Sequence, residues 1–160
     1  MENITTFIAN NKFKEGRKRG IRKIINLFIG GNIMVFLWPY IYFLKDGYSP
    51  LLPVFFIITL LGCNYITYTS IHDNNRILYS LDLSNNILKI STSSIWSNNI
   101  KEIILLTSDI SVSKGTFNWN GEGDKARGLI IRNKKKMKKY YIIEAYFDNY
   151  GELSETLKDI

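Results

Sequence analysis

The sequence has few of the residues on which enzyme active sites and metal centres most often depend. Its 160 residues include one histidine and one cysteine. A single chain therefore cannot form an internal disulfide, and a zinc site built from histidine and cysteine ligands cannot be assembled. A catalytic triad or a cysteine–histidine pair would have to use His72, which directly follows an apolar segment.

Other patterns of catalytic residues are also missing. The stretch GEGDKARG at residues 121–128 contains glycines and a lysine, but it lacks the spacing of a phosphate-binding loop that ends in Gly-Lys-Ser/Thr. Its carboxylates, Glu122 and Asp124, are not expected to be buried in such a glycine-rich segment, so nothing would tune them for acid–base catalysis. We therefore expect a protein that is not an enzyme and that uses no cofactor and no metal.

Charge is absent from two long segments, Ile24–Leu44 and Leu51–Ile71, each of 21 residues. As a helix, each would reach roughly 30 Å, which matches the hydrocarbon thickness of a bilayer. The polar residues Lys45–Ser49 and Pro50 join them. This pattern predicts a transmembrane helical hairpin over residues 24–71. The alternative is a buried hairpin in a soluble core, but soluble helices of this length rarely lack all charge.

Basic residues are concentrated before the first apolar segment, and they predict the orientation of the hairpin. The residues expected to flank the membrane are Arg17, Lys18, Arg19, Arg22 and Lys23. The connecting turn carries only Lys45 and Asp46. Because basic residues stay on the cytoplasmic side, we expect a multi-pass protein of the cytoplasmic (inner) membrane with both termini in the cytoplasm. Residues 1–23 are then a basic cytoplasmic segment.

Small and polar residues inside the two predicted spans suggest how the helices pack. If the chain folds back near Gly47, Asn32 comes level with Asn64, and Gly31 lies close to Gly62. Glycine permits close approach of two helices, and asparagine side chains can form hydrogen bonds across it. These four residues are predicted to hold the hairpin together or, alternatively, to contact another membrane subunit.

Residues 76–160 are long enough to form a second, cytoplasmic domain. Short apolar runs alternate with turn residues, which predicts about seven β-strands. Ile77, Tyr79, Leu81 and Leu83 share one face of the first run, and Leu88 and Ile90 share one face of the next. The last residues change period, because Tyr150, Leu153, Leu157 and Ile160 lie on one face of a helix. Asp148 or Asn149 is predicted to cap that helix, with Glu152 completing a capping box.

The run RNKKKMKKYY at residues 132–141 is the strongest local concentration of charge. It lies between two predicted strands, so it is predicted to be the tip of a hairpin. Its candidate binding residues are Arg132, Lys134, Lys135, Lys136, Lys138 and Lys139. With a net charge of +7, the chain favours anionic partners, and the tip can be a solvated turn, a contact with anionic lipid, or a contact with an acidic protein. No nucleic acid is expected, because the cations are not interleaved with exposed aromatics.

Two stretches carry a resemblance to a known family. In ILKISTSSIWSNNIKEIILL (87–106), a strand leads through Trp96 and a polar turn to an isoleucine-rich strand, and in YYIIEAYFDNYGELSETL (140–157) a late strand runs directly into a helix. With two preceding spans, this order resembles the bacterial pleckstrin-homology-like membrane proteins, including the YcxB-like group. The resemblance covers residues 24–160. It implies an α+β membrane protein with a two-helix hairpin followed by a seven-stranded PH-like sandwich or half-barrel and a closing helix.

The resemblance implies a binding or scaffold role without chemistry. The first functional hypothesis is therefore a membrane-anchored module that binds a protein partner, a subunit of a membrane complex or a second copy. The alternatives are an envelope-stress module that grips anionic lipid, and an immunity or inhibitor protein at the membrane. Trp96, Phe117 and Trp119 are predicted to belong to the core or, alternatively, to a surface that faces a peptide or lipid.

Overall fold

The computed structural model describes residues 5–47, 51–95, 99–117, 126–158 and 160. Its contacts divide the chain into two compact units. Unit 1 contains the residues up to Gly20 together with Asp73–Ile160, and unit 2 is Ile21–His72. The chain therefore leaves the first unit, forms the second, and returns to the first.

Two long helices, α1 (Asn11–Asp46) and α2 (Leu52–Asn74), contain the predicted apolar segments. Within the described residues, both are long and apolar enough to cross a membrane. Helix α1 begins well before the predicted span, because its first turns also have an apolar face. Phe13, Gly16, Gly20 and Ile24 are buried along this face, at the three- and four-residue spacing of a helix.

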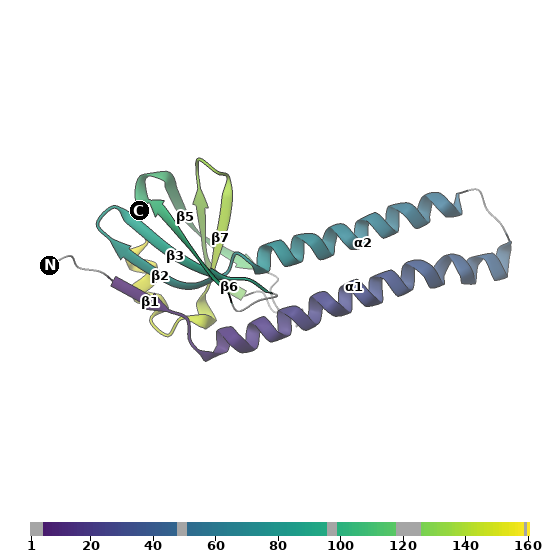
Figure 1. Ribbon diagram of the computed structural model, residues 1–160, viewed down its shortest axis with the longest axis horizontal. Coiled ribbons are helices and arrows are strands. Elements are labelled where there is room, and N and C mark those ends of the chain that lie inside the picture. The colour runs from purple at the N-terminus through teal and green to yellow at the C-terminus, as the bar shows by residue number, and fades with distance from the viewer. Residues whose placement is uncertain (1–4, 48–50, 96–98, 118–125, 159) are drawn as a thin grey trace. The chain divides into compact units, whose positions relative to one another are not determined.

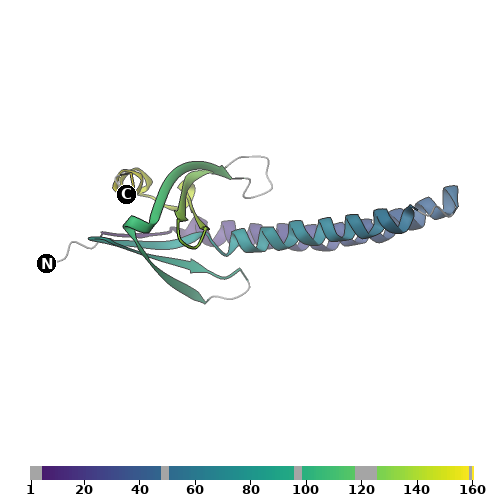
Figure 2. The ribbon, with the colours of Figure 1, turned by 90° about the horizontal axis from the view of Figure 1, so that it is seen from above.

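Unit 1 contains two antiparallel sheets (Figures 1 and 2). The first, sheet A, has the order β1-β2-β3-β4, formed by β1 (Thr5–Ile8), β2 (Leu78–Ser84), β3 (Ile87–Ser93) and β4 (Ile100–Leu106). The second, sheet B, has the order β5-β6-β7, formed by β5 (Ile110–Phe117), β6 (Ala126–Asn133) and β7 (Lys138–Ile143). Short 3-10 helices, η1 (Thr107–Asp109) and η2 (Glu144–Tyr146), follow β4 and β7, and helix α3 (Tyr150–Thr156) comes last.

The predicted α+β class with two apolar helices, a β-rich region and a closing helix is confirmed at this level. The described strands number about seven, as predicted, but their placement needs a correction, since only six of them come from residues 76–160. The remaining strand, β1, comes from the N-terminal segment that the sequence predicted to be a basic extension. It pairs antiparallel with β2, with Thr5 opposite Leu83 and Ile8 opposite Ser80.

The core of unit 1 is formed by the facing sides of both sheets and by α3. Leu81, Leu88 and Ile90 of sheet A are fully buried, as are Ile131 and Ile142 of sheet B. The predicted face of β3 is thus confirmed, and that of β2 in part, because Ile77 and Leu81 are buried whereas Tyr79 and Leu83 are only partly buried. Leu78 is also fully buried, because a register shift between Leu78 and Ser80 lets a second residue of β2 turn inward.

Helix α3 packs on the core through the predicted apolar positions. Leu153 and Leu157 are fully buried, and Tyr150 and Ile160 pack against the same cluster. The predicted capping bond is wrong, because Asn149 occupies the N-cap position without a side-chain capping hydrogen bond. Asp148 is engaged elsewhere: its carboxylate accepts a hydrogen bond from the Asn10 side-chain amide at 2.7 Å.

Candidate functional site: a basic turn at one end of the sheets

The basic run forms the β6–β7 turn, as the sequence predicts. The buried Asn133 side chain organises it, because its Oδ1 accepts a hydrogen bond from the Lys136 backbone N–H at 2.8 Å. Met137 follows with φ at +52°, a left-handed conformation that is uncommon for a residue with a side chain. Its side chain is 86% exposed. The turn thus presents an exposed methionine among lysines.

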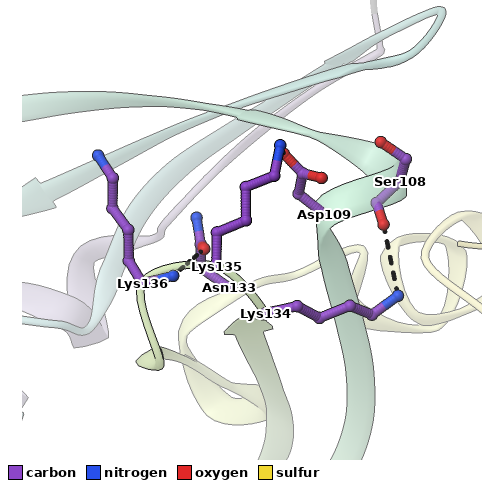
Figure 3. A network of polar contacts seen from close by, with 6 residues as sticks. All are labelled: Ser108, Asp109, Asn133, Lys134, Lys135 and Lys136. Carbon is purple, nitrogen blue, oxygen red and sulfur yellow. Dashed lines mark hydrogen bonds and ion pairs between the residues drawn. The ribbon is translucent and has the colours of Figure 1, made fainter.

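Two of the lysines are held against η1 (Figure 3). The Lys135 ammonium lies 2.7 Å from the Asp109 carboxylate, and the Lys134 ammonium donates to the Ser108 carbonyl at 3.4 Å. The Lys134 backbone N–H also donates to the Asp109 carbonyl at 2.7 Å. These contacts fix the turn against the β4–β5 corner. Because the Lys135 side chain is 70% exposed, the Lys135–Asp109 pair contributes only about 1 kcal/mol or less to stability, so its main effect is positional.

Of the four remaining cations of the candidate set, Lys136 lies in the turn, Lys138 lies opposite Asn133, and the other two face each other without an acidic neighbour in the register. Arg132 of β6 lies directly opposite Lys139 of β7, and both are exposed. Like charges at directly opposite positions destabilise a sheet. An anionic group bound between them would remove that repulsion, so this pair extends the cationic surface of the turn along sheet B.

The strand register places the basic turn at one end of sheet A. At this end, Ile87 pairs with Leu106, and the Thr107 N–H of η1 donates to the Asn86 carbonyl at 3.0 Å. At the other end, Ser93 pairs with Ile100. The seven residues of β3 separate these ends by roughly 20 Å at about 3.3 Å per residue.

The residues that flank the two connections to unit 2 contact the other end of sheet A. The Arg17 guanidinium of α1 donates to the Ser93 hydroxyl and to the Ser94 carbonyl. Asn75, just after α2, accepts a hydrogen bond from the Ile95 N–H at 2.6 Å. Within unit 1, the basic turn and these flanking residues therefore mark opposite ends of sheet A.

The predicted membrane-flanking cations do not all behave alike. Arg17 is half-buried, lies over the Phe13 ring at 5.9 Å, and burial lowers the pKa of its guanidinium. Its role within unit 1 is to hold the end of β3 through Ser93 and Ser94. The others, Lys18, Arg19, Arg22 and Lys23, are exposed along α1.

The predicted packing residues of the hairpin have mixed outcomes. A Cβ at Gly31 would lie only 3.3 Å from the Cys63 Sγ, so the helices approach closely at this point. A Cβ at Gly62 would meet nothing within 4 Å. The Asn32 and Asn64 amides donate to the Phe28 and Leu60 carbonyls of their own helices, at 2.6 and 2.8 Å. The two side-chain amides therefore form hydrogen bonds within their own helices rather than with each other.

A second cluster of interest lies on the outer face of sheet B. The Phe117 and Tyr141 rings meet edge to face at 5.3 Å, and the Tyr141 hydroxyl donates to the Asp73 carboxylate at 3.4 Å. Burial, and secondarily the nearby Asp73 carboxylate, raise the pKa of Tyr141. Phe117 is half-buried, whereas Trp96 and Trp119 lie outside the described residues, as does most of GEGDKARG.

No group of three or more His, Cys, Asp or Glu side chains in the described part of the chain could hold a metal ion. Sequence comparison finds no protein family model and no curated protein that matches this chain.

Two features of this arrangement were not evident in the sequence. The separation between the basic turn and Arg17 depends on the strand register. The spacing of residues in the sequence does not predict that register. The sequence does contain a weak hint of the role of Arg17. This residue lies beside an apolar face of the helix, which is formed by Phe13, Gly16, Gly20 and Ile24.

Proposed function

We propose that this protein is a non-enzymatic, membrane-anchored interaction module. The two helices span the cytoplasmic membrane as a hairpin, both termini lie in the cytoplasm, and a PH-like domain presents the basic β6–β7 turn to an acidic protein partner. The observation that carries the proposal is the pairing of β1 with β2 across the helices.

This pairing constrains the topology. Strand β1 precedes α1 and strand β2 follows α2, yet Ile8 lies directly opposite Ser80. If only one of the helices crossed a bilayer, the two strands would be on opposite sides and could not pair. Two crossings return the chain to the side on which it started. The exposed basic residues at the start of α1 favour the cytoplasm as that side.

The exposure of the helices also supports insertion. Large apolar side chains such as Phe36, Trp38, Phe55 and Leu61 are more than half exposed. A soluble protein rarely leaves so much contiguous apolar surface in water, whereas lipid would cover it.

The PH-like assignment is supported by the four-stranded and three-stranded antiparallel sheets and the closing helix. The order of strands and spans differs from that of the family that the sequence resembles. The resemblance puts all strands after the spans, whereas here the first strand precedes them, so the hairpin is an insertion between the first two strands of the domain.

A protein partner is favoured over lipid by the position of the basic turn within unit 1. The flanks of the hairpin, represented by Arg17 and Asn75, contact the opposite end of sheet A. The cations suited to anionic headgroups are the exposed lysines and arginines at the start of α1, directly before the apolar stretch. The turn is then available to a partner in the cytoplasm.

The experiment uses the full-length protein with Cys63→Ala in nanodiscs of neutral or anionic lipid. A fluorophore is attached at Lys136→Cys or, as the matched control, at Lys23→Cys, and quenching by headgroup-labelled lipids is measured. We expect quenching at position 23 and none at position 136 in either lipid. Quenching at position 136 in anionic discs would replace the protein partner with a lipid surface.

A second arm tests for the protein partner directly. A photo-crosslinking residue at Met137 in cells is expected to form a protein adduct. Replacing Lys134, Lys135, Lys136, Lys138 and Lys139 with glutamine should abolish it. An adduct that survives this change would contradict recognition through the lysines.

A further inference from the structure

Strand β4 is an unpaired edge of sheet A. It is the last strand in the order β1-β2-β3-β4, and Figure 2 shows it as the outermost strand on its side of the sheet. Its partner on one side is β3, over the full length Ile100–Leu106. The backbone N–H and C=O groups on its other side have no strand partner among the described residues. Such an edge is a template for an added strand.

Natural proteins usually protect an edge of this kind, but β4 has little protection. Its register with β3 runs through seven pairs without a bulge, and it contains no proline. Its charges, Lys101 and Glu102, stand near its start, and Glu102 is already paired with Lys89 of β3 at 3.0 Å. The segment from Ile103 to Leu106 carries no charge. A bulge-free edge whose last four residues are uncharged favours pairing with another extended chain.

The outer face beside this edge is largely apolar, apart from the Lys89–Glu102 ion pair. Ile100, Ile104 and Leu106 of β4 are 54%, 68% and 49% exposed, and Ile87 of β3, opposite Leu106, is also exposed. These side chains lie on one face of the sheet, with Glu102 between Ile100 and Ile104 on the same face. The continuous apolar part of the face is thus at the Leu106 end. An added strand with apolar residues at every second position would continue this row and cover it.

The edge leads directly to the basic turn. Ser108 and Asp109, which follow β4 in η1, are the residues that hold Lys134 and Lys135. A strand added along β4 would therefore pass the lysine-rich turn at the Leu106 end. Carboxylates at that end of the added strand would complement the charge.

We propose that β4 is the docking edge for an extended segment of the partner, with alternating apolar residues and an acidic end beside the basic turn. Antiparallel pairing, the more stable arrangement per residue, places the acidic residues before the segment's apolar residues. A second copy of this chain fits less well, since antiparallel pairing of β4 with itself would bring Lys101 rather than a carboxylate to the Leu106 end. This inference rests on the proposed function, because it takes the partner to be an acidic protein.

The test measures binding of a fluorescent peptide to the full-length protein in nanodiscs of neutral lipid. The peptide has three acidic residues followed by alternating threonine and valine. Control peptides replace the acidic residues with lysines, or replace one central threonine with proline. We expect binding of the first peptide only, with affinity falling as salt is raised, and slower amide hydrogen exchange over residues 100–106. Equal binding of all three peptides would overturn the proposal.

Two variants locate the site. Ile104→Lys places a charge on the exposed face of β4 and should weaken peptide binding at least tenfold. Ile8→Lys is the matched control, because Ile8 is 61% exposed on β1, the other edge strand of the same sheet. It should leave binding unchanged. Loss of binding in Ile8→Lys but not in Ile104→Lys would assign the site to β1 and contradict the inference.

The outcomes also separate the inference from the proposed function. If the crosslink at Met137 depends on the lysines but Ile104→Lys has no effect on the peptide or on the crosslink, the basic turn binds a partner and the β4 edge does not. If neither the crosslink nor the peptide depends on the lysines, both proposals fail. If Ile104→Lys converts a dimer to a monomer and the peptide does not bind, the occupant of β4 is a second copy and the inference is wrong.

Discussion

Single glycines determine how closely the strands of sheet B and their side chains approach. At Gly128 of β6, a Cβ would collide with the Ile142 carbonyl of the neighbouring strand β7 and press on the Phe117 ring. A backbone carbonyl within a paired strand cannot rotate away as a flexible side chain can. Gly151 of α3 is the opposite case, since a Cβ there would meet nothing within 4 Å.

Gly128→Ala is therefore expected to destabilise the protein by about 1–3 kcal/mol, the usual cost of overpacking. Gly151→Ala should be neutral or stabilise by up to about 1 kcal/mol, because alanine favours a helix over glycine. Chemical unfolding of the full-length protein in mild detergent measures both. Equal effects of the two changes would show that the close approach at Gly128 is not a constraint.

Tyr141 is expected to make the stability of the folded protein depend on pH in the alkaline range. Its pKa is raised in the folded protein by burial first and by the Asp73 carboxylate second, and burial also raises the pKa of Tyr140 and Tyr150. A raised pKa favours the protonated phenol in the folded state. Its contribution is complete below the unfolded pKa of about 10 and is lost as pH rises through the folded value.

We expect the free energy of unfolding to decline above about pH 10, and Tyr141→Phe to make that decline shallower. Denaturant unfolding at pH 8, 9, 10 and 11 checks this for both proteins. An identical decline in the variant would show that Tyr141 does not contribute to it.

At the scale of elements, β1 is the feature that most changes the interpretation of the chain. The apolar segments and the buried face of β3 at Leu88 and Ile90 were predictable, because long uncharged runs and alternating apolar residues are visible in the sequence. Strand β1 leaves no such trace, since it has four residues, Thr5–Ile8, and only Phe7 among them is buried. The start of α1 was also missed, because the prediction followed the uncharged run rather than the apolar face that begins at Phe13.

The basic turn illustrates the same division. Its residues and its place between two strands were predictable from charge and alternation. Its position at the opposite end of sheet A from Arg17 was not, because that depends on the register of β3 with β4 and on the contacts between η1 and the turn. Long-range register is set by the packing of the whole core, which one local pattern does not encode.

If β1 completes sheet A, truncating its one buried side chain should lower the stability of the protein far more than truncating the exposed neighbour. Phe7 is 5% exposed and belongs to the core cluster, so Phe7→Ala should cost about 3–5 kcal/mol. Ile8→Ala, at an exposed position of the same strand, should cost less than about 0.5 kcal/mol. Unfolding in mild detergent compares the two, and similar small effects would mean that β1 is dispensable.

At the scale of the molecule, the two long helices are inserted in the chain between the first two strands of unit 1. The chain forms β1, passes through both helices, and then pairs β2 with β1, so the domain can be completed only when both ends of the hairpin are on one side. Anchoring and folding are thus coupled in the proposed topology. In that topology, the basic turn and the β4 edge would belong to a domain attached to the membrane at two points, which would limit its movement relative to the bilayer.

The measurement that tests this account most directly is thiol labelling in intact cells. In a Cys63→Ala background, Lys45→Cys marks the turn between the helices, and Lys136→Cys marks the basic turn. A membrane-impermeant maleimide should label position 45 in intact cells, and should label position 136 only after the membrane is opened. Labelling of both positions in intact cells, or of neither, would contradict a membrane-spanning hairpin that carries a cytoplasmic binding domain.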